Sequence, residues 1–504
     1  MRTKAVRSFI VFIYLFLILV ALAGVNQLMA RPATRVDPTR IADDIRDILD
    51  PDHLKLVASN ESPFKPTSVC RQCHRGHDEE WTNSMHYLSW RDPIFKTFYN
   101  QYLAYLGNPE IISEETYETV MGKVVPPPYD KGERKERLGY VEEETKAQRE
   151  VLRHGNLRTY YEYMTLKEVV KDPMIKLTRE ELGIVIHGEG LLPDGLIDGK
   201  SQINCLRCHA PGADLTMDKN FILENNSDGV FCDYCHLIID RYDDIHYVIL
   251  INSQIKQGPY IQTVSSSHCI EPSKLIVQSE FCKDCHQYTN PLGMQVYNTY
   301  TEWFNSDYNT GGNATGGNIT TCQECHMPGY RGRASIVSDV RQEVFDHTFY
   351  GGNTPDFLKE CATVEVESTI ETANILLDVK VKNDKAGHNL PGDSPLRELI
   401  LIVRLKGPEG ETLWQGKRVY RRVYGDLEGN PTFSPWRASQ VLSDTTLKPM
   451  EERVENFTVP RPDVEGNVYI TAQLFYRLTP EDQPNLIANA PKPIRVDHAV
   501  HFIQ

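Results

Sequence analysis

The sequence lacks an excess of positive charge. It has 54 lysine and arginine residues against 69 aspartate and glutamate residues, which gives a formal net charge of −15 over 504 residues. Basic patches interleaved with aromatic residues are not visible. Because nucleic-acid binding depends on clustered positive charge, this balance excludes a nucleic-acid partner and favours partners that are cationic or make polar contacts.

The sequence also has little cysteine outside one repeated pattern. Ten of its twelve cysteines lie in five copies of Cys-x-x-Cys-His, whereas a chain of this composition would carry roughly 0.01 copies by chance. In chain order, motifs 1 to 5 are "CRQCH" from Cys70, "CLRCH" from Cys205, "CDYCH" from Cys232, "CKDCH" from Cys282 and "CQECH" from Cys322. For the remaining pair, Cys269 and Cys361, we expect either one disulfide or two thiols.

The spacing of the motif suits covalent attachment of a c-type haem. Two thiols three positions apart can bond the two vinyl groups of one haem, and the adjacent histidine can ligate its iron. Zinc is the alternative, but zinc modules rarely place a histidine directly after every cysteine pair. We therefore predict five haem c groups. Their attachment residues are Cys70, Cys73, Cys205, Cys208, Cys232, Cys235, Cys282, Cys285, Cys322 and Cys325. Their proximal iron ligands are His74, His209, His236, His286 and His326.

The N-terminus carries an export signal. A basic flank, "MRTKAVR", precedes the apolar run of residues 8–25. The run is near the shortest length that spans a bilayer, and "ALA" at 21–23 and "LMA" at 28–30 offer small residues for a signal peptidase, so residues 1–30 are either a cleaved signal peptide or a retained membrane anchor. Export agrees with c-type haem attachment, and we expect the protein at the cell surface, in the periplasm or secreted.

The rest of the chain divides by pattern. Residues 31–65 are polar and punctuated by proline, as in a spacer. Residues 66–355 hold the motifs and are predicted to be mostly helix and loop, with a helical insertion at about 95–200. Residues 361–504 contain no motif and alternate strands with turns, which predicts an immunoglobulin-like β-sandwich. The fold class is therefore α+β and multidomain.

The chain resembles the multihaem c-type cytochromes related to cytochrome c-554, hydroxylamine oxidoreductase and cytochrome c nitrite reductase. The resemblance covers about residues 66–350 and rests on "CRQCHRGHDEEWTNSMH", "GVFCDYCH", "SEFCKDCHQYTNPLG", "YTEWFNSDY", and "CQECHMPG" followed by "HTFYGG". The run "AGHNLPGDSPLRELIL" is similar to the start of the β-domain that follows the haems in some of these proteins.

The resemblance implies distal iron ligands as well. His86, His347 and His268 match distal positions of that group. His246 and His187 are our choices for the last two irons, although either is also compatible with a buried histidine held by a hydrogen bond. His77 and His388 stay open as alternatives. No role is predicted for His53, His154, His498 or His501.

The resemblance implies an exported electron carrier with redox proteins or an extracellular acceptor as partners. Two other functions stay open. Related pentahaem enzymes act on nitrite or hydroxylamine at one five-coordinate haem, but the nitrite reductases typically have lysine in the catalytic motif, and all five motifs here keep histidine. Subunits of some related cytochromes stack into filaments, which the spacer and surplus histidines here would allow.

Overall fold

The computed structural model describes residues 62–107, 184–186, 195–197, 199–216, 225–241, 247–250, 255–260, 268–312, 316–483 and 491–503, with single residues between some of these ranges. The predicted signal or anchor at 1–30 and nearly all of the predicted spacer lie outside the described residues. Among the helices in the described ranges, none is long and apolar enough to cross a membrane.

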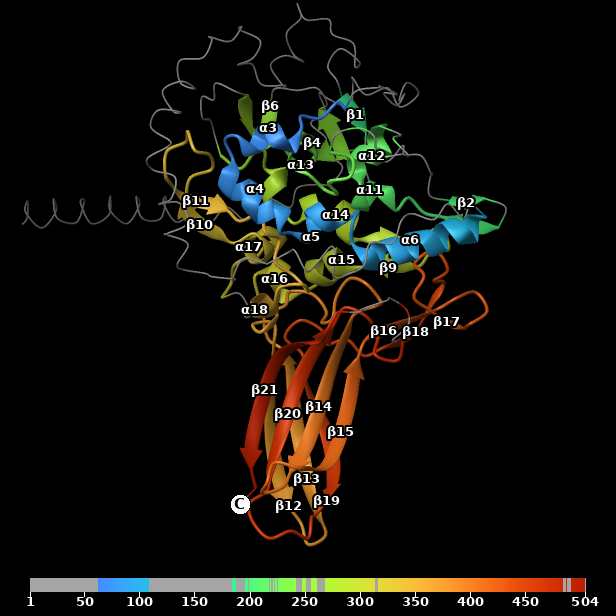
Figure 1. Cartoon of the computed structure of the whole chain (residues 1–504), viewed down its shortest axis with the longest axis vertical. Coiled ribbons are helices and arrows are strands. Elements are labelled where there is room, and N and C mark those ends of the chain that lie inside the picture. The colour runs from blue at the N-terminus through green and yellow to red at the C-terminus, as the bar shows by residue number, and fades with distance from the viewer. Residues whose placement is uncertain are drawn as a thin grey trace, which may run out of the picture.

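The motifs lie in a part of the molecule built from short helices (Figure 1). The helices are α3 Thr67–Arg71, α4 Arg75–Thr82, α5 Met85–Leu88, α6 Pro93–Leu106, α11 Leu206–His209, α12 Pro211–Thr216, α13 Cys232–His236, η4 Leu275–Val277, α14 Glu280–His286, α15 Thr299–Phe304, α16 Asp307–Thr310, α17 Cys322–His326 and α18 Pro355–Leu358. Most of them span one or two turns, so packing between long helices is not what organises this part of the chain.

The longest described helix, α6, has strong local signals at both ends. The side chain of Asp92 accepts a hydrogen bond from the backbone N–H of Ile94, and Pro93 occupies the first turn, where its missing N–H costs nothing. Gly107 ends the helix with φ of 88°, a conformation that favours glycine. The helix packs Phe98, Tyr99 and Tyr102 into the cluster of buried aromatic residues beside motif 2.

Short strands run among the motifs, where the sequence led us to expect mostly helix and loop. The strands among the motifs are β1 Ile184–Ile186, β2 Gly195–Ile197, β3 Lys200–Gln202, β4 Ile238–Arg241, β5 Tyr247–Leu250, β6 Ile255–Gly258, β7 Cys269–Pro272, β8 Tyr288–Thr289, β9 Gln295–Tyr297, β10 Gly329–Gly332 and β11 Arg341–Phe345. They pair in sheets of two or three strands. The predicted helical insertion therefore begins as helix but ends in strands, because the β-branched run of β1 pairs with β5, placing Val185 opposite Ile249.

The C-terminal region consists of two antiparallel sheets that share one core (Figure 1). One sheet has the order β12-β13-β19 and the other β15-β14-β20-β21. Their strands are β12 Ala362–Ile370, β13 Asn374–Asn383, β14 Glu398–Lys406, β15 Thr412–Tyr420, β19 Glu452–Pro460, β20 Tyr469–Arg477 and β21 Ile494–Phe502. Alternate residues of β13, including Leu377, Val379 and Val381, are fully buried, while Asp378 between them is exposed. The predicted mixture of helix and strand, with strands gathered at the C-terminal end, is confirmed.

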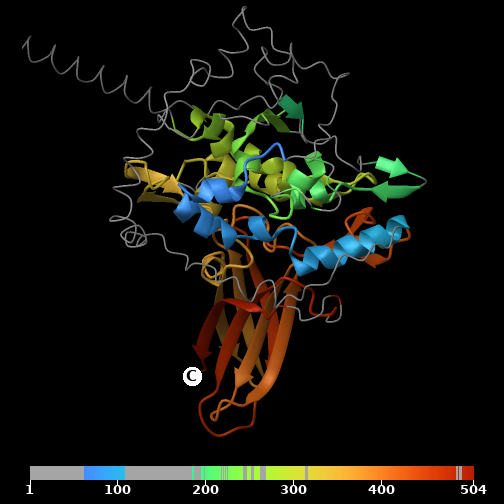
Figure 2. The same cartoon turned by 45° about the horizontal axis from the view of Figure 1, so that its top comes forward.

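A third small sheet lies between these two parts. Its strands are β16 Arg422–Gly425, β17 Pro431–Thr432 and β18 Gln440–Asp444. The hydroxyl of Tyr424 donates to the carbonyl of Val296 in β9, and the ring of Trp436 lies 5.1 Å from that of Tyr102 in α6. Figure 2 shows this region against the helices, above the long strands.

Of the two alternatives expected for Cys361, the structure shows the thiol. Cys361, at the start of the C-terminal region, is buried and its thiol donates to the carbonyl of Phe357 at 3.4 Å. The side chain of Cys269 itself lies outside the described residues.

Candidate functional site

Each motif occupies one turn of helix, and this explains how its three side chains can meet one group. Motifs 3 and 5 coincide with α13 and α17, and motifs 2 and 4 end α11 and α14. In motif 1 the backbone N–H of His74 donates to the carbonyl of Cys70 at 2.9 Å, which closes a turn there too. Residues three and four positions apart lie on the same face of such a turn. The two thiols and the imidazole of each motif therefore face the same side.

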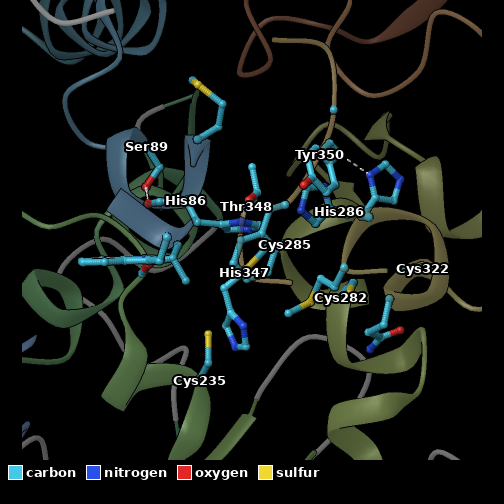
Figure 3. A pocket seen from close by; sticks show the side chains of 18 of the residues that line it. His86, Ser89, Cys235, Cys282, Cys285, His286, Cys322, His347, Thr348 and Tyr350 are labelled. Atoms are coloured by element: carbon cyan, nitrogen blue, oxygen red, sulfur yellow. Dashed lines mark hydrogen bonds between the residues drawn. The ribbon is translucent and has the colours of Figure 1, made fainter. Parts of the chain in front are cut away.

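All five motifs open onto one cavity. It has a volume of about 2260 Å³ and is lined by the ten motif cysteines and the five motif histidines. Ordinary small-molecule pockets measure about 300–1,000 Å³, so this cavity has room for several large groups. Figure 3 shows part of it, where the side chains of His86, His286 and His347 lie around the same space as Cys235 and Cys285.

Four of the five motif histidines are oriented through Nδ1 by a backbone carbonyl. The acceptors are Ala334 at 2.6 Å for His74, Ser89 at 3.2 Å for His209, Gln257 at 2.6 Å for His236, and Tyr350 for His326. A carbonyl at Nδ1 fixes the tautomer and leaves Nε2 with its lone pair, as in metal-ligating histidines. The fifth, His286, faces a carboxylate instead, with its Nδ1 3.9 Å from Oδ1 of Asp393.

Burial keeps these imidazoles neutral, which is the form that binds a metal. Burial and the neighbouring His77 lower the pKa of His74 to about 4. Burial likewise lowers the pKa of His209 to about 4 and that of His326 to about 3, and it lowers the pKa of His236. These four side chains are therefore uncharged at neutral pH.

Four motif histidines face a second histidine at a nearly constant distance. A metal–imidazole bond is about 2 Å long and the ring centre lies about 1 Å farther, so two ligands on opposite sides of one iron hold their ring centres roughly 6 Å apart. The observed separations are 6.1 Å for His74 and His268, 6.2 Å for His236 and His347, 6.3 Å for His286 and His86, and 6.3 Å for His326 and His388. The residues present thus fit iron between two imidazoles at four places.

The structure places the histidines predicted as distal ligands in different situations. His86, His268 and His347 each lie opposite a motif histidine, as just described, while His187 and His246 lie outside the described residues. His388, which the sequence left as an alternative, completes the fourth pair. The signal for it was present in the "AGHNLP" run, but nothing local connects that loop with His326, 62 positions earlier.

Motif 2 differs from the other four. The ring of Phe95 in α6 stacks on that of His209 at a centroid separation of 3.7 Å and an angle of 12°. Among the residues that the structure describes, no histidine ring is found opposite His209 at about 6 Å. The described residues therefore supply no second histidine ligand at motif 2.

His77 fits a supporting role better than that of a ligand. Its Nδ1 lies 3.1 Å from Oε2 of Glu80, and its ring centre is only 4.4 Å from that of His347, too close for a haem between them. The 6.4 Å between the rings of His77 and His74 is not a ligand pair, because the two residues lie on the same face of one helical turn. The backbone N–H of His347 donates to the same carboxylate at 3.0 Å. His77, Glu80 and His347 offer ligand atoms within 4.8 Å of one another. Because His347 already faces His236, we regard this cluster as the support of that histidine.

The positions of the motif cysteines show which motifs are neighbours. Cysteines of different motifs lie beside one another, with Cys70 next to Cys232, Cys208 next to Cys285, and Cys282 next to Cys322. The backbone N–H of Cys322 also donates to the hydroxyl of Ser279 at 3.0 Å. Motif 1 therefore lies beside motif 3, and motif 4 lies beside both motif 2 and motif 5.

Comparison with known proteins agrees with this geometry. The family model described as cytochrome c554 and c-prime matches residues 192–237, which include motifs 2 and 3. The crystal structure of a penta-haem cytochrome c552 from Thermochromatium tepidum is similar with a TM-score of 0.54 and 21% identity, covering 88% of this chain and 99% of that chain. These findings support a multihaem c-type cytochrome. They support haem c as its cofactor and electron transfer, in general terms, as its function.

Two other solved structures match a smaller share of the chain. A putative beta-galactosidase from Bacteroides fragilis has a TM-score of 0.16 and 12% identity, covering 29% of this chain and 17% of that chain. A beta-glucuronidase from Bacteroides uniformis has a TM-score of 0.15 and 12% identity, covering 28% of this chain and 14% of that chain. These scores are too low to carry an argument. No curated protein matches the chain.

Proposed function

We propose that the chain is an exported pentahaem c-type cytochrome that carries electrons in respiratory or extracellular electron transfer. The observation that carries this proposal is the set of four histidine pairs with ring centres 6.1 to 6.3 Å apart. One member of each pair is the histidine of a Cys-x-x-Cys-His motif. Haem, when bound, supplies a one-electron iron couple. The paired imidazoles would hold a bound haem iron from both sides, an arrangement that suits electron transfer and needs no acid, base or nucleophile.

The neighbour relations of the motifs support a branched route through the protein. Cysteines of motif 4 lie beside cysteines of motifs 2 and 5, and a cysteine of motif 1 lies beside one of motif 3. Cys235 of motif 3 packs in one apolar cluster with Phe281 of α14, which joins the two groups. Motif 4 is therefore at the centre of the proposed route.

The predicted apolar segment of residues 8–25 supports export, and covalent haem attachment has the same requirement. We propose that this segment is either a cleaved signal peptide or a retained anchor, and that the partners are redox proteins or an extracellular acceptor. Assembly into filaments is an alternative to the proposed carrier. The strand orders β12-β13-β19 and β15-β14-β20-β21 support an immunoglobulin-like domain at 361–504.

Motif 2 favours a second candidate function, reduction or oxidation of a small nitrogen compound such as nitrite or hydroxylamine. The reason is that His209 has no second histidine opposite it in the described ranges. An iron held on one side only would leave a position for substrate. His187 is the histidine that we propose to fill this position in the carrier.

Low-temperature electron paramagnetic resonance (EPR) of the oxidised, fully loaded protein tests the choice. A carrier gives five low-spin irons, and the variant His187→Ala converts one of them to high spin. The matched control His501→Ala, on β21, leaves all five low-spin. High-spin iron in the unchanged protein, at about one fifth of the total, would contradict the carrier and call for turnover assays with nitrite and hydroxylamine.

A further inference from the structure

One loop of the C-terminal region enters the cavity. It connects β13 with β14, and His388, Asp393 and Arg397 on it all line the cavity. Asp393 has a φ of 66°, and the preceding Gly392 allows the ring of His388 to pack against its Cα, where a Cβ would lie 2.7 Å from Nδ1. The loop conformation thus holds a histidine toward motif 5 and a carboxylate toward motif 4.

The carboxylate sets motif 4 apart from the other motifs. His74, His209, His236 and His326 each donate Nδ1–H to a neutral carbonyl, whereas His286 faces Asp393 at 3.9 Å. That separation is an ion-pair distance and not a hydrogen bond. In the described part of the chain no carbonyl accepts from Nδ1 of His286.

The second histidine at motif 4 is also unlike the others. The ring planes of His86 and His286 are inclined by 78°, while the other three pairs are inclined by 25°, 26° and 12°. Nδ1 of His86 is buried and has no hydrogen-bond partner. His86 therefore lacks a polarising group of its own, and Asp393 is the charged group that acts on this ligand pair.

We propose that Asp393 is a positioning residue that lowers the reduction potential of the haem bound at Cys282, Cys285 and His286. The proposal rests on the proposed function. A negative charge facing the N–H of a ligating imidazole draws the proton outward and makes the ring a stronger donor. Stronger donation favours the ferric state, which carries one more positive charge, and the nearby carboxylate favours it directly by charge attraction.

Because motif 4 lies between other motifs, the reduction potential of its haem affects electron transfer to the neighbouring haems. Because motif 4 contacts motifs 2 and 5, a lower potential at its haem makes the electron leave it more readily than it arrives. The C-terminal region then controls how electrons divide between the neighbouring haems. It does so through one loop side chain, without contributing a haem motif of its own.

The test is a redox titration of the fully loaded protein followed by EPR. Two imidazole rings that are nearly perpendicular would leave two of the iron d orbitals close in energy. The haem at motif 4 should therefore give a more anisotropic low-spin EPR signal than haems held by near-parallel rings. The variant His86→Met, which replaces one of the two rings, assigns this signal by removing it. In Asp393→Asn we expect the midpoint of that signal to rise while the midpoints of the other signals stay in place.

The matched control is Asp92→Asn. Asp92 also lines the cavity and interacts with Arg397, but the groups acting on it include no motif histidine, and asparagine keeps the cap of α6. In Asp92→Asn the anisotropic signal should have the same midpoint potential as in the unchanged protein. An unchanged midpoint in Asp393→Asn, or an equal shift of all haems, would overturn the proposal.

Two further measurements keep the outcome decisive. If Asp393→Asn does not load haem, Asp393→Ser, which also removes the negative charge, is titrated: a rise in midpoint confined to the anisotropic signal supports the proposal, and an unchanged midpoint overturns it. Failure of the proposed function itself is recognised separately. The unchanged protein would then carry fewer than five haems per chain by pyridine haemochrome assay, or its irons would not be low-spin by EPR.

Discussion

Backbone carbonyls orient two of the histidines that lie opposite a motif histidine. Nδ1 of His347 donates to the carbonyl of Phe345 at 2.9 Å and Nδ1 of His388 donates to that of Asn389 at 2.8 Å. The carbonyl of His388 in turn accepts from the side chain of Asn383 at 2.9 Å. Such support holds the ring in place before any iron is present, so the cost of orienting it is met by folding.

The pair of His388 with His326 leads to a prediction at this scale. In His388→Ala we expect one iron in five to become high-spin, because the structure brings no other described histidine opposite His326. The control is His498→Ala, whose histidine lies in β21 away from the cavity lining. Spin quantification by EPR at low temperature measures both variants. Five low-spin irons in His388→Ala would show that another side chain ligates this haem.

At the scale of elements, the turn before α13 fixes the position of His86. Gly229 has a φ of 65°, and the backbone N–H of Val230 donates to the carbonyl of His86 at 2.8 Å. A Cβ on Gly229 would overlap that carbonyl and would also lie 2.5 Å from the hydroxyl of Ser89. The chain reaches this close approach only with glycine.

We therefore expect Gly229→Ala to lower the free energy of unfolding by more than the roughly 1–2 kcal/mol that a left-handed conformation costs an ordinary residue. Gly293→Ala is the matched control, because Gly293 has a φ of 80° but open space around its Cα. Denaturant unfolding measures both. Equal losses in the two variants would mean that the backbone of His86 moves freely, and the proposed fixing of this histidine would be wrong.

The sequence predicts the elements whose signals are local. The five motifs, the alternation in β13 and the termini of α6 follow from residues a few positions apart. The short strands among the motifs were missed, since runs as brief as that of β1 acquire their conformation from a partner strand. The approach of His388 to His326 and of Asp393 to His286 was beyond prediction, because it depends on how the C-terminal region docks.

At the scale of the whole molecule, a buried ion pair joins the two regions. Arg422 of β16 contacts Glu302 of α15 at 2.8 Å, and the two side chains are 12% and 8% exposed. The other oxygen of Glu302 accepts from the backbone N–H of Asn389 at 3.0 Å. One carboxylate therefore links the third small sheet, the helices and the residue next to His388, so docking of the C-terminal region and the geometry at motif 5 should change together.

This linkage predicts the effect of removing the cation. Arg422→Met leaves Glu302 buried without its charged partner, and breaking a buried pair in this way costs about 3–5 kcal/mol. The control is Lys417→Met in the pair of Lys417 with Glu481, whose side chains are 45% and 44% exposed, and here we expect a loss of about 0–1 kcal/mol. Thermal unfolding followed at the haem absorbance should show a lower transition temperature in Arg422→Met, with high-spin iron at motif 5 appearing in the same transition. A haem transition that precedes unfolding of the β-strands by circular dichroism would show instead that the two regions separate independently.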